Sequence, residues 1–177
     1  KQAMLAHAGE LRQLVLGILE EVRRLARDLR PSTLDELGLV PTIDWHIRAF
    51  TRNIDLEVEY ETALPDDFRL PVSLELALYR MVQEALTNIV RHANATKAVI
   101  RLEEEHGVVR LTVSDNGCGF DTNAMLNGQA HGIGLMGIQE RVELIGGTLA
   151  LNSIIGRGTS LSIEVPILAR QQWHENP

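Results

Sequence analysis

Cysteine is almost absent from this chain of 177 residues, since Cys118 is the only one. It cannot form an internal disulfide, so a disulfide-stapled secreted scaffold is excluded and a reducing, cytosolic setting fits best. No apolar run approaches the length of a membrane-spanning helix and no signal peptide occurs, so we expect no membrane contact. Positive charge is also scarce. The net charge of −7 argues against a nucleic-acid partner, which would need a basic surface.

Two nucleotide-binding signatures are missing as well. No Gly-Lys-Ser/Thr tripeptide occurs, which excludes a Walker A loop. The glycine-rich segment 132–137 lacks the strand context and the acidic residue of a dinucleotide-binding fingerprint. A negative net charge does not exclude an anionic ligand, however, because backbone N–H groups and a metal ion can hold phosphates locally.

The apolar and charged fractions are those of an ordinary globular protein. Residues 1–29 are predicted to form one long amphipathic helix, which Pro31 ends. Its apolar stripe consists of Leu11, Leu14, Ile18, Val22, Leu25 and Leu29. Nothing precedes this helix for the stripe to pack on, so a partner helix is favoured over the chain's own core. The chain starts at Lys1 inside the helical pattern, and we expect it to be an excised piece of a longer protein.

Beyond Pro31 the pattern alternates between helices and strands. Residues 32–40 are predicted to be a connector. Strands are predicted at 54–60, 97–103, 108–115, 148–154 and 158–166. Helices are predicted at 42–52, 71–93 and 135–145, with Pro41 suiting the first turn of the first. The order predicts an α+β fold: a two-layer sandwich with a mixed sheet and helices on one face.

Polar residues follow one face of the helix predicted at 71–93. Glu84 and Asn88 are one turn apart, and Arg91 and His92 come a further turn along. An asparagine inside a helix is unfavourable, so a function should offset its cost. A carboxylate and an amide oxygen can ligate Mg²⁺, directly or through water, while the cations reach phosphates. A plain solvated face fits this helix alone equally well.

The sequence Asp-Asn-Gly-Cys-Gly-Phe over 115–120 follows a strand directly. A carboxylate at a strand end can accept a hydrogen bond from the exocyclic amine of adenine and selects against guanine, which has an oxygen there. Gly117 and Gly119 permit positive φ and the close approach of a flat ligand. The alternative is an ordinary Asp-Gly turn.

Two further segments contain glycines. The first opens a helix, whose N-terminal N–H groups and dipole favour an anion. It contains His131, Gly132, Gly134, Leu135, Met136 and Gly137. The second, Gly-Arg-Gly-Thr over 156–159, is either a plain hairpin turn or a place from which the Thr159 hydroxyl reaches a nucleotide.

These four segments, in this order, resemble the N, G1, G2 and G3 boxes of the GHKL ATPase superfamily. This is the Bergerat fold shared by histidine kinases, gyrase B, Hsp90 and MutL. The segment Gln-Glu-Ala-Leu-Thr-Asn-Ile-Val-Arg-His-Ala over 83–93 is similar to the N box of two-component sensor histidine kinases. Leu-Arg-Pro over 29–31, followed by Leu-Asp-Glu-Leu-Gly-Leu over 34–39, resembles the end of the dimerisation domain in the NarL-partnered, HisKA_3-type kinases.

The resemblance implies roles for individual residues. Asn88 would ligate Mg²⁺, Glu84 would act on it through water or as a polarising base, and Asp115 would read the adenine amine. Residues 121–131 would be the ATP lid. The implied nucleotide-binding residues are Asn88, Arg91, His92, Asp115, Gly117, Gly119, Phe120, His131, Gly132, Gly134, Leu135, Met136, Gly137 and Thr159.

The resemblance also implies an organisation and an activity. Residues 1–31 would be the second helix of a dimerisation bundle, 32–53 a connector and first helix, 54–168 the ATP-binding catalytic domain, and 169–177 a loose tail. Such kinases pass the γ-phosphate of ATP to a histidine in a homodimeric bundle and then to the receiver domain of a response regulator. The acceptor of this branch lies in a His-Asp pair, and no such dipeptide occurs in this sequence. The fragment is therefore expected to bind ATP without phosphorylating itself.

Three other functions are weighed against this one. An anti-sigma-factor serine kinase has the same fold, but the long N-terminal helix and the Leu-Arg-Pro connector count against it. An ATPase clamp such as gyrase B or MutL carries long extra segments for which this chain has no room. A nucleotide-free interaction scaffold is disfavoured because Glu84, Asn88, Asp115 and the glycines are all present.

Overall fold

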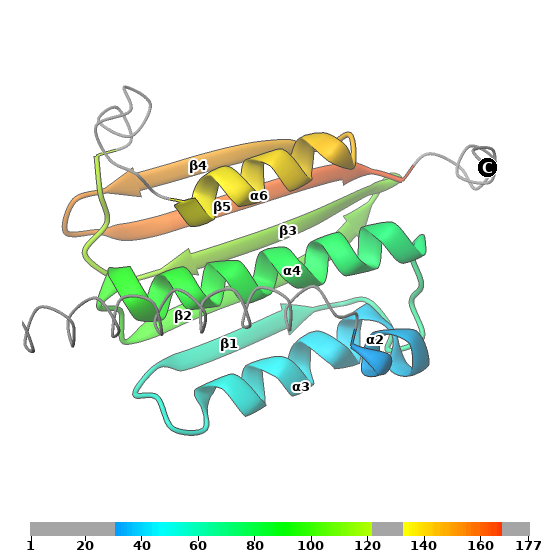
Figure 1. The fold of residues 1–177 in the computed structure, drawn as a ribbon, viewed down its shortest axis with the longest axis horizontal. Coiled ribbons are helices and arrows are strands. Elements are labelled where there is room, and N and C mark those ends of the chain that lie inside the picture. The colour runs from blue at the N-terminus through cyan, green and yellow to red at the C-terminus, as the bar shows by residue number, and fades with distance from the viewer. Residues whose placement is uncertain (1–30, 122–132, 168–177) are drawn as a thin grey trace, which may run out of the picture. The chain divides into compact units, whose positions relative to one another are not determined.

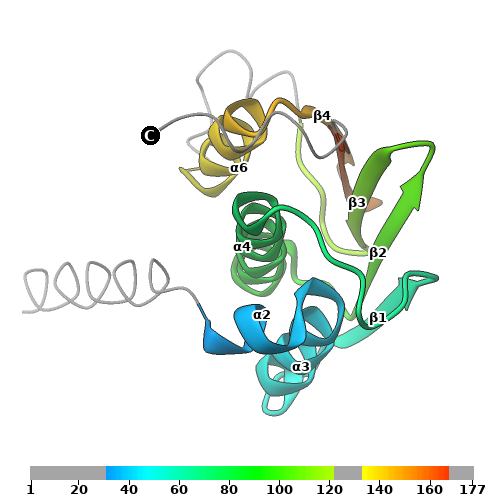
Figure 2. The same cartoon turned by 90° about the vertical axis from the view of Figure 1, so that its right-hand side faces the viewer.

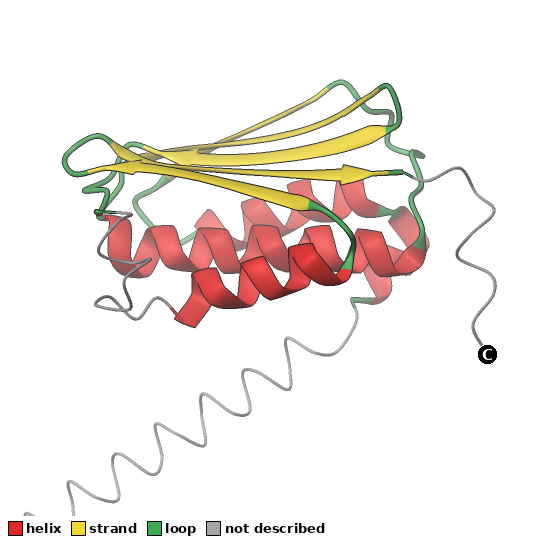
Figure 3. Ribbon diagram, turned by 90° about the horizontal axis from the view of Figure 1, so that it is seen from above, coloured by secondary structure: helices red, strands yellow, loops and turns green. Residues whose placement is uncertain are grey.

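The computed structural model describes residues 31–121 and 133–167, and the chain divides into two compact units between Ser32 and Thr33. The second unit is a two-layer sandwich in which the helices cover one face of a single sheet (Figures 1 and 3). This confirms the predicted α+β architecture. The helix predicted over 1–29 and the tail predicted from residue 169 lie outside the described residues.

The sheet has five strands in the order β1-β2-β3-β5-β4. Their bounds are β1 Glu57–Thr62, β2 Lys97–Glu105, β3 Val108–Asp115, β4 Thr148–Ile154 and β5 Gly158–Pro166. β1 pairs with β2 in parallel, and all other neighbouring pairs are antiparallel. The sheet is therefore mixed, as predicted. The parallel pair is joined by a crossover through a helix, which parallel strands require.

The helices form the second layer. Their bounds are α2 Ser32–Leu37, α3 Leu39–Thr51, α4 Val72–Asn88, the π-helical turn η1 Ile89–Ala93, and α6 Ile133–Leu144. Seen along the strands, α3, α4 and α6 lie side by side against the sheet (Figure 2). None of the described helices combines the length and the apolarity needed to cross a bilayer.

The core lies between the two layers and follows from the alternation along the strands. In β2 the side chains of Ile100 and Leu102 are fully buried, whereas their neighbours in sequence are partly or fully exposed. In β3 the same holds for Leu111 and Val113. Opposite them α4 buries a stripe at helical spacing, which includes Leu78. One face of the sheet is thus apolar and covered, and the other is polar and open.

Several predicted boundaries were wrong. The connector expected over 32–40 is helical except for Gly38, where the chain turns between α2 and α3. Leu34 before this turn and Leu39 after it are both fully buried in the core. Gly38 makes that turn with a φ of +87°, a conformation that glycine adopts without strain. The helix after it accordingly begins at Leu39, earlier than Pro41.

The strand predicted over 54–60 is displaced toward the C-terminus, because β1 begins only where its backbone meets β2, at the pair Glu57 and Lys97. The helix predicted over 135–145 begins earlier, at Ile133. The helix predicted over 71–93 keeps its extent, but its last five residues form the π-helical turn η1.

Candidate nucleotide-binding site

Three of the four sequence segments meet at one end of the sheet. β3 ends there at Asp115, the β4–β5 turn lies beside it, and the far end of α4 approaches through η1 (Figure 1, left). The amide of Cys118 donates a hydrogen bond to the carbonyl of Ala93 at 2.7 Å, and the amide of Gly156 donates to the carbonyl of Cys118 at 2.7 Å. The loop after β3 is thus held by the helix on one side and by the hairpin turn on the other.

Asp115 is half-buried and has a fixed orientation. The amide of Gly117 donates to its Oδ1 at 2.8 Å, and Asp115 is the register partner of Thr159 on β5. Burial raises the pKa of the Asp115 carboxyl, while hydrogen bonds from the backbone amides of Gly117 and Thr159 act in the opposite direction. A half-buried carboxylate with only part of its hydrogen-bonding capacity used can accept a further donor from a ligand.

The glycines of this loop are required by the chain's own backbone. A Cβ on Gly117 would stand 2.3 Å from the carbonyl oxygen of Ala93, and one on Gly119 would stand 2.1 Å from that of Ile154. Gly119 also has a positive φ of +59°. From the sequence, these glycines were predicted to let a flat ligand come close. In the structure, the groups that come close to them are backbone atoms of the protein. Phe120 follows, and its amide donates to the Ser153 hydroxyl at 2.9 Å.

The end of α4 presents the predicted metal ligands. Glu84 and Asn88 are both half-buried and lie one turn apart on the same helix. The Nδ2 atom of Asn88 is buried and has no hydrogen-bond partner among the described residues. An unpaired buried amide is costly, and a half-turn of this amide would put its oxygen in the same place.

These residues fit a magnesium ion. An amide oxygen at that position is a suitable ligand for a hard cation, and Glu84 one helical turn before it offers a carboxylate on the same helix. Within the described ranges no cluster of three His, Cys, Asp or Glu side chains could hold a metal by itself. That is the usual situation for Mg²⁺, which keeps several waters and takes other ligands from the phosphates of its substrate.

Arg91 and His92, the two residues predicted to face the phosphates, belong to the π-helical turn. Arg91 and His92 are both exposed and belong to η1, so they do not continue the regular helical face of Glu84 and Asn88. The wider turn also brings the carbonyl of His92 to 3.3 Å from the Cys118 thiol, which donates to it. Single π turns often occur at functional sites, where they redirect side chains.

A sequence model of the family described as "Histidine kinase-, DNA gyrase B-, and HSP90-like ATPase" matches residues 73–169, more than half of the chain. The chain belongs to this ATPase family. The match begins at the first turn of α4 and includes all four segments gathered above. It confirms the superfamily that the motifs indicated, and such a domain binds ATP.

The most similar proteins found include several histidine kinases. The chain is 35% identical over 162 residues to the signal transduction histidine-protein kinase/phosphatase DegS of Brevibacillus brevis, covering 92% of this chain and 41% of that protein. It is 34% identical over 167 residues to the oxygen sensor histidine kinase NreB of Staphylococcus carnosus, covering 94% of this chain and 47% of that one. The chain thus spans less than half the length of these relatives.

Solved structures share the fold. The histidine kinase domain of the Erythrobacter litoralis EL346 blue-light activated histidine kinase superposes with a TM-score of 0.56 at 23% identity, over 73% of this chain and 59% of that one. The mycobacterial sensor histidine kinase MprB gives a TM-score of 0.54 at 21% identity, over 72% of this chain and 93% of that one.

The remaining segment, residues 131–137, is described only in part. His131 and Gly132 lie outside the described residues, as does nearly all of the predicted lid over 121–131. Gly134, Leu135, Met136 and Gly137 lie inside α6, so Gly134 and Gly137 are helical and do not belong to a preceding loop. A Cβ on Gly137 would meet only the Arg141 guanidinium, at an ordinary 3.5 Å. The nucleotide-binding role of the segment 131–137 stays a prediction.

Ser153 was not predicted as a site residue. This residue of β4 is buried and is the register partner of Thr159, and the two hydroxyl oxygens are 3.0 Å apart. A signal existed: the alternation over 148–154 puts Leu149, Leu151 and Ser153 on one face, and a serine that continues an apolar face needs a polar partner.

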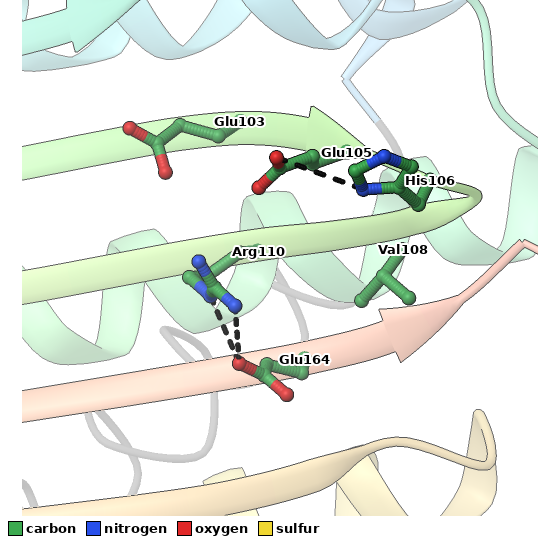
Figure 4. A pocket seen from close by; sticks show the side chains of 6 residues that line it. All are labelled: Glu103, Glu105, His106, Val108, Arg110 and Glu164. Carbon is green, nitrogen blue, oxygen red and sulfur yellow. Dashed lines mark hydrogen bonds and ion pairs between the residues drawn. The ribbon is translucent and has the colours of Figure 1, made fainter.

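A pocket lies at the end of the sheet opposite Asp115. It opens at the β2–β3 turn and is lined by Glu103, Glu105, His106, Val108, Arg110 and Glu164 (Figure 4). Arg110 Nη2 pairs with Glu164 Oε1 at 2.8 Å, and the His106 ring is 3.6 Å from Glu105. β3 separates this pocket from Asp115 by roughly 20 Å, at about 3.3 Å per residue. It lies apart from the candidate nucleotide site, and the side chain of His106 is exposed.

His46 has a structural place in the fold. Its ring stacks edge-on against Tyr79 with ring centres 5.5 Å apart, between α3 and α4. His7 and His174 lie outside the described residues.

Proposed function

We propose that this chain is the ATP-binding catalytic part of a cytoplasmic two-component sensor histidine kinase. The proposal draws on the ATPase family of residues 73–169 and on the similarity to histidine kinases over more than nine-tenths of the chain. The observation that carries the site is the half-buried Asp115 carboxylate, fixed by the Gly117 amide at the end of β3. Since the chain spans less than half of those relatives, the rest of the reaction is part of the proposal.

Asp115 selects the base. Its carboxylate accepts a hydrogen bond from the exocyclic amine of adenine, and the corresponding oxygen of guanine would repel it. The backbone of the loop after β3 is held between η1 and the β4–β5 turn. This fixed backbone, at Gly117, Gly119 and Phe120, forms the wall of the base pocket. Thr159, next to Asp115 in the sheet, contributes a hydroxyl to the same edge of the base.

The phosphates lie toward α4 and α6. Asn88 would hold Mg²⁺ directly and Glu84 would hold it through water; the bound ion neutralises the charge of the transferred phosphoryl group. Arg91 and His92, exposed on η1, face the phosphates. His131, Gly132, Gly134, Leu135, Met136 and Gly137 supply the phosphate-side segment, at the positive end of the α6 dipole.

In the proposed reaction a histidine nitrogen attacks the γ-phosphorus, and the bond from that phosphorus to the bridging oxygen of ADP breaks. The acceptor histidine belongs to a segment absent from this chain, and a response regulator receiver domain then takes the phosphoryl group. Residues 1–31 join a second copy in the homodimeric bundle. The chain by itself therefore binds ATP without phosphorylating itself, and acid-labile phosphohistidine after incubation with γ-labelled ATP would contradict this.

Titration with a fluorescent ATP analogue and Mg²⁺ tests the site. Asp115→Asn replaces one acceptor oxygen by a donor and should weaken binding at least tenfold, since a hydrogen bond to a charged group contributes about 1.5–3 kcal/mol. Asn88→Asp should weaken the magnesium-dependent part only. Asn152→Asp on the open face of β4 is the matched control and should bind normally. Equal binding by all variants would show that the site is wrongly assigned.

A rival reading is an anti-sigma-factor serine kinase of the same fold. Such a kinase would phosphorylate a serine on a small protein substrate, and its phosphoprotein survives acid. Adding an acceptor bundle of the HisKA_3 type and testing the product for acid lability separates the two readings.

A further inference from the structure

The two edge strands of the sheet differ in charge. β1, at one edge, carries Glu57, Glu59 and Glu61. β4, at the other edge, has the sequence Thr-Leu-Ala-Leu-Asn-Ser-Ile, with no charged residue and no proline. Its register with β5 runs without a break from Thr148 to Ile154, so no bulge interrupts it. Charges, prolines and bulges are the usual devices that keep an edge strand from pairing with another chain, and β4 has none of them.

The outer side of β4 has no strand partner in the part of the chain that the structure describes, where β4 pairs with β5 and ends the sheet (Figure 1). Its free backbone edge is about 23 Å long, at about 3.3 Å per residue. Apolar side chains are exposed at both ends of this strand. Leu144, just before it, is 83% exposed, and Ile154 and Ile155, at its end, are 51% and 72% exposed. Such a gathering around one open strand favours an interaction surface.

A second copy of β4 fits this edge in a single full register. Opposed residues of antiparallel strands lie on the same side of the sheet, so a symmetric pair must be centred on a residue. Centring on Leu151 pairs all seven residues of the strand, with Thr148 opposite Ile154 and Ala150 opposite Asn152 of the second copy. Centring on Ala150 or Asn152 instead would leave two residues of each strand unpaired.

Charges also favour a second copy at this edge. Antiparallel pairing puts the turn after β4 of one copy beside the turn before β4 of the other. Arg157, exposed in the first turn, then comes to the same end as Glu143, exposed in the last turn of α6. Self-pairing of β1 centred on Glu59 would instead oppose that residue to itself and Glu57 to Glu61, and like charges directly opposite are unfavourable. Two chains of net charge −7 therefore meet best along β4.

We infer that β4 is an interface between two copies of this chain: the two β4 strands pair antiparallel about a two-fold axis at Leu151 and join the two sheets into one. Such a contact uses the same surface on both copies. It is separate from the proposed helical contact through residues 1–31, so it adds to that association. The inference does not depend on the proposed nucleotide site.

Charge substitutions on the whole chain test the interface and its register. Ala150 and Asn152 are both exposed and would oppose each other across the two-fold axis. The double variant Ala150→Lys, Asn152→Lys puts two pairs of like charges in contact, and its self-association should be about tenfold weaker than that of the wild type. The double variant Ala150→Lys, Asn152→Glu makes two pairs of opposite charges, and its association should return to the wild-type level. Sedimentation velocity over a range of concentrations measures all three.

The two double variants are matched controls for each other, since they differ only in the charge at residue 152. Nucleotide titration should give the wild-type affinity for both, which shows that the folded unit is intact. Cross-linking tests the register independently. Copies with Ala150→Cys and copies with Asn152→Cys, all with Cys118→Ser, are mixed and oxidised. A disulfide between copies should form in the mixture and much less in either sample alone, because each position is offset from its own counterpart by about 7–8 Å.

Two outcomes would overturn the inference. If wild type and the Lys-Lys variant sediment alike at every concentration, β4 does not pair with a second copy, and its free edge suits a strand of another protein instead. If the Lys-Glu variant associates as weakly as the Lys-Lys variant, or if the mixed cysteine variants do not cross-link, residues 150 and 152 do not oppose each other and the two-fold pairing at Leu151 is wrong.

Discussion

At the scale of single residues, the candidate nucleotide site is built from close backbone approaches. Gly158 shows the tightest one: a Cβ there would stand 1.9 Å from the carbonyl oxygen of Asp115, and its φ is +87°. Gly156, two residues earlier in the same turn, also has a positive φ of +77°, but nothing lies within 4 Å of its Cβ position. The two glycines therefore separate the effect of contact from the effect of backbone conformation.

We expect Gly158→Ala to abolish detectable ATP binding and to lower the free energy of unfolding by at least about 3 kcal/mol, because β5 must move away from Asp115. Gly156→Ala should cost only about 1 kcal/mol, the penalty of a positive φ for a residue with a Cβ, and should bind ATP almost normally. Urea unfolding and nucleotide titration of both variants check this. Similar losses in the two variants would contradict the importance of the contact.

At the scale of elements, α4 connects the two ends of the sandwich. Its first turn carries Glu75, which is fully buried, and its last turns carry Glu84 and Asn88. Arg69 donates to the two Glu75 carboxylate oxygens at 2.9 and 3.2 Å, and the Leu70 amide donates to the same carboxylate at 3.1 Å.

Arg69 also reaches the end of α2. Its guanidinium donates to the carbonyls of Asp35 and Leu34 at 3.4 and 3.5 Å. These carbonyls belong to the last turn of α2, where helical partners run out. A single arginine thus ties the first helix of the ATPase unit to the start of the helix that carries the predicted magnesium ligands.

We expect Arg69→Ala to lower the free energy of unfolding by about 3–5 kcal/mol, because it leaves the buried Glu75 charge without its partner. Arg48→Ala is the control: Arg48 pairs with Asp44 one helical turn away at an exposed site, and such pairs contribute about 0–1 kcal/mol. The double variant Arg69→Met, Glu75→Leu should recover most of the loss, since it removes the buried charge as well. Chemical denaturation measures all three.

At the scale of the whole molecule, one hydrophobic core extends across the predicted domain boundary at residue 54. The side chains of Leu34, Leu39 and Ile43 are fully buried, and Ile47 is nearly so, in one cluster with α4 and the sheet. The helices α2 and α3 consequently belong to the same packed body as the ATP-binding segments.

We expect a chain that begins at Thr33 to fold and to bind the ATP analogue as tightly as the full sequence. A chain that begins at Ile54 should not fold. It loses the five buried apolar side chains of Leu34, Leu39, Val40, Ile43 and Ile47. At about 1.5–3 kcal/mol each, their loss matches the whole stability of about 5–15 kcal/mol that a domain has. Circular dichroism and titration decide this. Analytical ultracentrifugation of the same samples tests the predicted dimerisation through residues 1–31, which should be lost in the chain that begins at Thr33.

Much of this protein could be predicted from local sequence alone. The alternation of apolar and polar residues over 108–115 and 158–166 predicted β3 and β5 with their bounds. A strand has a period of two residues, so neighbouring residues alone reveal it. Asp115 and its glycines were identified for the same reason, as a compact motif directly after a strand. The mixed sheet and the helical layer followed from the order of the elements.

The tertiary structure decided what depends on residues far apart in the chain. The start of β1 is set by where it meets β2. The contact of η1 with the loop after β3, through Ala93 and Cys118, and the pairing of the Ser153 and Thr159 hydroxyls likewise join separate segments. Such registers and contacts arise only when separate segments pack against each other, and no periodicity within one segment encodes them.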